Sequence, residues 1–152
     1  MTLSRKGKKD RFDLFAAMPP LEAKTALFRL CMQEVEPGDE ERKLMLIDVR
    51  KAHLNGKVDS EESVYVELPP ESHRPGKCAR LKRWLYGMRP AANAWERDFR
   101  EKLESIGFVC GIAAPTVFHN YASDVSCVVH GDDFTFLGRD GDLRKIEKTM
   151  RS

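Results

Sequence analysis

The sequence predicts an α+β fold with a mainly antiparallel sheet and helices on one face. Apolar residues at helical spacing alternate with short apolar runs, in the order helix, strand, short strand, helix, hairpin, helix. Helices arranged in this way cover a sheet rather than connect parallel strands. The chain has 152 residues and no internal repeat, low-complexity tract or linker, so we expect one domain.

The N-terminal part of the sequence predicts a helix and a long strand. Apolar side chains recur at helical spacing over residues 21–35, between Pro19-Pro20 and a Pro-Gly-Asp sequence at 37–39. Residues 43–49, KLMLIDV, form a near-continuous apolar run, which is typical of a strand buried on both faces. Asp48 lies near the end of this strand, where a charge is costly unless something binds it.

The middle of the chain predicts a short strand and a second, longer helix. Residues 63–68 are expected to form a strand that Pro69-Pro70 ends, and residues 78–85 form a further strand or the approach to a helix. Residues 91–106 have the clearest helical periodicity, and Gly107 is the expected C-cap. The remaining elements are a strand over 116–121 and a terminal helix over 141–150.

The most informative feature is a pair of adjacent aspartates at the tip of an expected hairpin. Apolar runs at 125–129 and 134–137 predict its strands, and Gly131 lies in the turn before Asp132 and Asp133. Two carboxylates about 4 Å apart repel by roughly 1 kcal/mol in water, and by several times more near a low-dielectric surface. Such a pair favours a bound cation, and its hard oxygen ligands suit magnesium or manganese. The alternative is a solvated Asp-Asp turn, since aspartate is common in turns.

The charge and composition of the chain bear on which classes of protein it can belong to. The net charge is only +2, which makes no case for nucleic acid by itself. No run of 18 apolar residues exists that would span a membrane, and the basic N-terminus lacks the apolar segment of a signal peptide. The four cysteines form no CxxC pair and are expected to be reduced thiols of an intracellular protein. Residues 1–11 are expected to form a basic mobile arm, either solvated or in contact with phosphate.

Several segments, in the same order along the chain, resemble the reverse transcriptases of copia-type retrotransposons. Residues 48–56, DVRKAHLNG, and 64–70, VYVELPP, are similar to motif A and the strand after it. Residues 80–95, RLKRWLYGMRPAANAW, resemble the family's RLKKSLYGLKQAPRAW segment, which carries motif B. Residues 130–133, HGDD, stand where motif C has Tyr/Phe-Val-Asp-Asp. Further likeness extends the match over residues 12–150, and several ordered motifs are more specific than any one of them.

The resemblance implies both a fold and a reaction. The fold would be the ferredoxin-like palm of a right-hand polymerase over residues 12–152, with incomplete fingers and no thumb. The reaction would be RNA-directed DNA synthesis, in which two magnesium (or manganese) ions about 3.5–4 Å apart assist nucleotidyl transfer to a primer 3′ end. The partners would be an RNA/DNA template-primer and deoxynucleoside triphosphates, with no membrane. The missing fingers, thumb and ribonuclease H regions would lie elsewhere in a polyprotein, located in a cytoplasmic virus-like particle or in the nucleus.

The family's residue roles carry over by position. Asp48, Asp132 and Asp133 would be the catalytic metal ligands. His53 stands at the steric gate that excludes the ribose 2′-hydroxyl. The other positions implied near the nucleotide or the nucleic acid are Val49, Ala52, Tyr86, Gly87 and Arg89.

The sequence departs from the family pattern at three places, and alternatives stay open. His53 replaces an aromatic gate, Pro90-Ala91-Ala92 replaces Gln-Ala-Pro, and His130-Gly131 replaces the aromatic–Val pair before the acids. None of these changes touches the three acids. One alternative is a truncated or degenerate palm without catalysis, which at most binds metal or nucleic acid weakly. Another is a different two-metal enzyme, such as a nucleotide cyclase, against which the motif B likeness argues.

Overall fold

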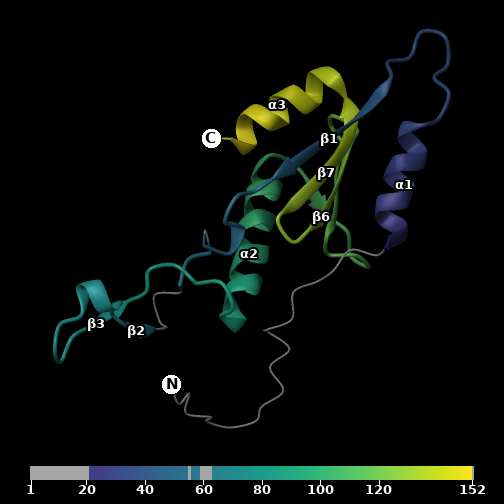
Figure 1. Ribbon diagram of the computed structural model, residues 1–152. Helices are drawn as coiled ribbons and strands as arrows, with labels where there is room; N and C mark the ends of the chain where they lie inside the picture. The colour runs from purple at the N-terminus through teal and green to yellow at the C-terminus, as the bar shows by residue number, and fades with distance from the viewer. Residues whose placement is uncertain (1–20, 55, 59–62, 152) are drawn as a thin grey trace.

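The computed structural model describes residues 21–54, 56–58 and 63–151, which form helices around an antiparallel sheet (Figure 1). The main sheet has the order β1-β7-β6-β5-β4, and every neighbouring pair is antiparallel. Its strands are β1 (Arg42–Asp48), β4 (Val109–Cys110), β5 (Val117–Asn120), β6 (Val125–His130) and β7 (Asp133–Arg139). The helices are α1 (Leu21–Cys31), α2 (Arg89–Ser105) and α3 (Asp140–Met150), with 3-10 turns η2 (Ala52–Leu54) and η3 (Pro70–Ser72). The predicted α+β class with a mainly antiparallel sheet is confirmed.

The helices cover both faces of the main sheet, so the expectation that they lie on one face was wrong. α2 and α3 pack over a core that includes Phe118, Phe134 and Phe136. α1 packs on the opposite face, where Leu27 meets Val128 and Leu137. Figure 1 shows α1 on the other side of the sheet from α2 and α3. The apolar stripe of a helix predicts that it packs against something, but not which face of the sheet it covers.

β1 is an edge strand, and the prediction that it is buried on both faces was also wrong. Met45 and Ile47 pack against the main core. On the other face Leu44 packs near α1, but Leu46 is 70% exposed. An apolar run shows a preference for burial, whereas the neighbours in space decide how much of it is covered. The end of β1 that carries Asp48 is therefore open to solvent.

The helix ends follow local rules where the sequence provides them. Gly107 has φ +89°, its N–H donates to the Glu104 carbonyl at 3.0 Å, and the Phe108 N–H donates to the Leu103 carbonyl at 3.1 Å. This pair of bonds is a Schellman motif, in which Ile106 is the C-cap and Gly107 follows it. The prediction that Gly107 ends α2 is therefore confirmed, one position after the cap itself. α1 ends at Cys31 rather than near residue 35, because the chain leaves the sheet there: Met32 is 84% exposed.

A second, two-stranded sheet extends from the domain beside α2 (Figure 1). It pairs β2 (Tyr65–Glu67) with β3 (Cys78–Arg80). The short strand expected over residues 63–68 is confirmed, and of the two possibilities left open for residues 78–85 the first three residues form a strand. All four cysteines are free. None of the described helices is long and apolar enough to cross a membrane. The predicted basic arm at residues 1–11 lies outside the described residues.

Candidate active site

Two adjacent strands bring three carboxylates together. Asp48 is the last residue of β1 and Asp133 is the first of β7, and the antiparallel register pairs them directly. Asp132 precedes Asp133 in the β6–β7 turn. Carboxylate oxygens of the three residues lie within 4.8 Å of one another, and all three side chains are exposed. The structure thus confirms that residues far apart in the sequence form one acidic cluster.

The turn that presents Asp132 depends on a glycine. His130 pairs with Asp133, so Gly131 and Asp132 form a two-residue connection. Gly131 has φ +65°, a backbone conformation that costs other residues roughly 1–2 kcal/mol. Tight hairpin turns with glycine at the first central position match the twist of the flanking strands. Gly131 is therefore the turn residue that the sequence predicted.

Two hydrogen bonds hold this turn in place. The Val49 N–H donates to the Asp132 carbonyl at 3.0 Å, which extends the β1–β7 contact into the turn. The Trp95 Nε1–H donates to the Gly131 carbonyl at 2.8 Å. The Trp95 ring is buried against Phe99 and Phe134, so α2 fixes the tip of the hairpin from the core side. Both carbonyls of the turn are thereby engaged.

A lysine from α1 reaches the same tip from the other face. The Lys24 ammonium lies 3.3 Å from His130 Nδ1. Because an ammonium can only donate, Nδ1 is the accepting nitrogen in this contact. No local signal in the sequence identifies it, since the two residues are 106 positions apart.

The electrostatics of the cluster favour a cation from outside the chain. Among the described residues, no lysine or arginine side chain forms an ion pair with Asp48, Asp132 or Asp133. Like charges about 4 Å apart repel by roughly 1 kcal/mol in water and by about 4 kcal/mol at an effective dielectric constant near 20. Three carboxylate oxygens are hard ligands that fit magnesium or manganese. The residues present therefore suit a divalent ion.

The other residues that the resemblance implied lie around the end of β1 and before α2. Ala52 is 1% exposed and belongs to the main core, so only its backbone can face a ligand. The backbone of His53 lies in η2. Tyr86 is 54% exposed and Gly87 has φ +81°, both on the loop before α2, and the backbone of Arg89 begins that helix.

Part of the chain is similar in sequence to the Pol polyproteins of plant transposons. The chain is 33% identical over 104 residues to the Retrovirus-related Pol polyprotein from transposon RE2 of Arabidopsis thaliana, and 32% identical over 102 residues to that from transposon RE1. It is 28% identical over 103 residues to the Pol polyprotein from transposon TNT 1-94 of Nicotiana tabacum. These alignments cover 64–65% of this chain but only 7–8% of the relatives' own length. No solved structure matches the chain.

A family model covers more of the chain than these alignments. The model is described as reverse transcriptase (RNA-dependent DNA polymerase), and it matches residues 25–152, which contain all three clustered acids. The copia-type likeness read from the motifs agrees with the transposon origin of the relatives. The chain therefore belongs to the reverse transcriptase family.

Proposed function

We propose that this chain is the catalytic palm of a copia-type Pol polyprotein and adds deoxynucleotides to a primer paired with a template. The observation that supports the proposal is the cluster of Asp48, Asp132 and Asp133 in a chain of the reverse transcriptase family. The cluster lies at an exposed end of two paired strands, where a large polymeric substrate can reach it.

We further propose that the three aspartates hold magnesium, or manganese in its place, as a pair of ions. When bound, the ions would neutralise charge on the transferring phosphoryl group and on the attacking and leaving oxygens. The chain's own contribution is to keep the carboxylates in position. Asp48 and Asp133 are held by strand register, and Asp132 by the hydrogen bonds at its own and the Gly131 carbonyls.

The positions implied by the family likeness complete the proposal. His53, at the steric gate, would disfavour the ribose 2′-hydroxyl of a ribonucleotide. Val49, Ala52, Tyr86 and Gly87 would surround the incoming nucleotide. Arg89 would lie near the template or a phosphate.

The test is primer extension by a chimera in which residues 25–152 replace the matching region of the transposon RE2 polyprotein. We expect the chimera to extend a primer, and Asp132→Asn to slow extension by about 100-fold or more, because a carboxylate ligand of the ions is lost. Asp124→Asn is the matched control. Asp124 is also an exposed aspartate in a hairpin turn, but it pairs with Arg42 at the opposite end of the strands.

The control chimera should extend the primer at the unsubstituted rate. An unsubstituted chimera that fails to extend, or an Asp132→Asn chimera that extends normally, would contradict the proposal. The first result would favour a degenerate palm without catalysis.

A further inference from the structure

The β2–β3 hairpin, residues 64–83, carries a concentration of cations outside the candidate active site. Residues 73–83 include five lysines or arginines among eleven residues: Arg74, Lys77, Arg80, Lys82 and Arg83. The acids on the described hairpin are Glu67 and Glu71. The concentration is local, because the net charge of the chain is only +2.

Most of these cations lack the carboxylate partners that other surface cations have. On α3, Arg144 pairs with Asp140 at 2.8 Å and Lys145 pairs with Asp142 at 2.9 Å. Over the part of the chain that the structure describes, no carboxylate lies within ion-pair distance of the following four side chains: Arg74, Lys77, Arg80 and Lys82. Close cations that are not neutralised create a positive potential that attracts an external anion.

An exposed aromatic side chain lies beside these cations. Tyr65 on β2 pairs in register with Arg80 on β3, so the two side chains project from the same face of the hairpin. Tyr65 is 58% exposed. Proteins that bind single-stranded nucleic acids combine these two features, because bases stack on the ring while phosphates meet the cations. An acidic peptide would use the cations but has no base to stack.

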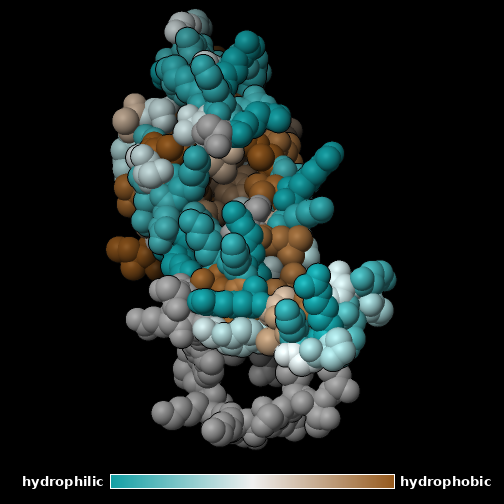
Figure 2. Space-filling view, turned by 90° about the vertical axis from the view of Figure 1, so that its left-hand side faces the viewer, coloured by the Kyte–Doolittle hydropathy of each residue, from teal (hydrophilic) through white to brown (hydrophobic). Residues whose placement is uncertain are grey.

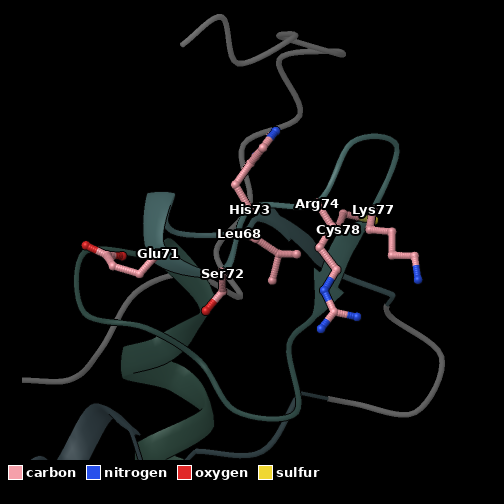
Figure 3. A pocket seen from close by; sticks show the side chains of 7 residues that line it. All are labelled: Leu68, Glu71, Ser72, His73, Arg74, Lys77 and Cys78. Carbon is pink, nitrogen blue, oxygen red and sulfur yellow. The ribbon is translucent and has the colours of Figure 1, made fainter.

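The loop of the hairpin forms an open pocket of about 440 Å³ (Figure 3). Arg74 and Lys77 line it together with Ser72, and the Glu71 side chain points away from both cations in Figure 3. In Figure 2 the hairpin faces the viewer in the lower part of the molecule, where hydrophilic side chains predominate. Glu71 also lines the pocket, but two cations outnumber its single carboxylate, so the balance of charge there favours a phosphate group.

The hairpin and the acidic cluster are anchored at the same end of α2. From Asp48 the chain passes through η2 to Gly56, whose carbonyl accepts a hydrogen bond from the Trp84 N–H at 3.0 Å. Trp84 is 3% exposed and packs with residues of the first turns of α2, Ala91 and Ala94. The next residue of this helix, Trp95, holds the tip that carries Asp132. A nucleic-acid strand bound at the acidic cluster would therefore lie near the β2–β3 hairpin.

We infer that the β2–β3 hairpin binds single-stranded nucleic acid, with Arg74, Lys77 and Arg80 on phosphates and Tyr65 stacked on a base. The inference rests on the proposed function, which supplies an unpaired template strand beyond the primer. Phosphate contacts and stacking carry no sequence information by themselves. Binding by the hairpin is therefore salt-dependent and tolerant of sequence.

The experiment measures binding of the 152-residue chain to a labelled single-stranded RNA of about 20 nucleotides over a series of salt concentrations, by fluorescence anisotropy. The variant combines Arg74→Ala, Lys77→Ala and Arg80→Ala. It should weaken binding about tenfold or more at low salt and reduce the slope of log affinity against log salt by about 2, at about 0.7 per phosphate contact. Circular dichroism verifies that the variant is folded.

The matched control combines Arg144→Ala, Lys145→Ala and Lys148→Ala, which removes the same charge from exposed positions of α3. Its slope should equal that of the unsubstituted chain. Tyr65→Leu should weaken binding about fivefold or more with an unchanged slope, because stacking releases no counterions.

Three results would overturn the inference. The hairpin variant could keep its affinity and slope, the α3 control could lose as much as the hairpin variant, or poly-glutamate could bind as tightly as RNA. Binding is measured without metal or nucleotide, so it is independent of catalysis. If the chimera fails to extend a primer while the 152-residue chain still binds RNA through the hairpin, only the polymerase proposal is contradicted. If the chimera extends a primer while the hairpin variant binds RNA as well as the unsubstituted chain does, only this inference is contradicted.

Discussion

Asp133 is paired on both sides in the main sheet, with Asp48 of β1 and with His130 of β6. Directly paired residues project from the same face, so these three side chains form a row across the strands. A shift of one residue in the pairing of β7 with β1 would put Asp48 on the face opposite to Asp133, and the same shift against β6 would do so for His130. Strand register therefore fixes the site, together with the turn that positions Asp132.

Cys127 contrasts with the exposed acids and gives a prediction at the scale of a residue. Its side chain lies in the core, and burial raises the pKa of the thiol well above its ordinary value. Because only the thiolate is nucleophilic, Cys127 stays protonated and unreactive at about pH 8, whereas Cys78 on β3 is exposed. We expect iodoacetamide to modify Cys78 in the folded chain and Cys127 only after unfolding, as peptide mass spectrometry would show.

The two cysteines provide an internal comparison within one sample. Urea should make their rates similar, because unfolding removes the burial that raises the pKa of Cys127. Equal modification of both thiols in the absence of urea would contradict the buried position of β6.

At the scale of elements, the β6–β7 turn determines how well the acids are held. Gly131→Ala should destabilise the fold by about 1–2 kcal/mol, because alanine is strained at φ +65°. Gly141→Ala is the matched control. Gly141 lies in α3, and a Cβ added there would meet open space. This substitution should therefore stabilise the fold by about 0.5–1 kcal/mol. Urea denaturation measures both changes. If the free energy of unfolding changed in the same direction in both variants, the left-handed backbone conformation of Gly131 in this turn would be contradicted.

Local patterns predicted those elements whose boundaries are determined locally. The β6–β7 hairpin and α2 were predicted because Gly131 and Gly107 mark their ends through backbone conformations that glycine favours. The sequence did not predict β4, because its two residues, Val109 and Cys110, are a strand only through pairing with β5. Nor did it predict the exposure of Leu46, since α1 leaves that part of the sheet uncovered.

At the scale of the whole molecule, contacts between distant segments assemble the candidate site. The strand and hairpin patterns singled out Asp48, Asp132 and Asp133, and the family resemblance gave them a role, but only the sheet shows that their oxygens lie within 4.8 Å. The bond from Trp95 to Gly131 joins α2 to the hairpin tip, and Lys24 reaches His130 from α1. Such contacts have no sequence signal, because they depend on which faces the helices cover.

The central claim is that Asp48 and Asp133 on paired strands, with Asp132 in the adjoining turn, form one site for divalent metal ions. The most direct measurement is a titration of the ¹⁵N-labelled chain with Mn²⁺, which broadens amide signals near the bound ion. We predict that broadening begins together at residues 47–49 and 131–134, and that Asp48→Asn weakens it at both segments. Asp140→Asn changes an aspartate of α3 whose side chain is 45% exposed, and it should leave the broadening unchanged. Broadening centred on α3, or insensitive to Asp48→Asn, would contradict the account.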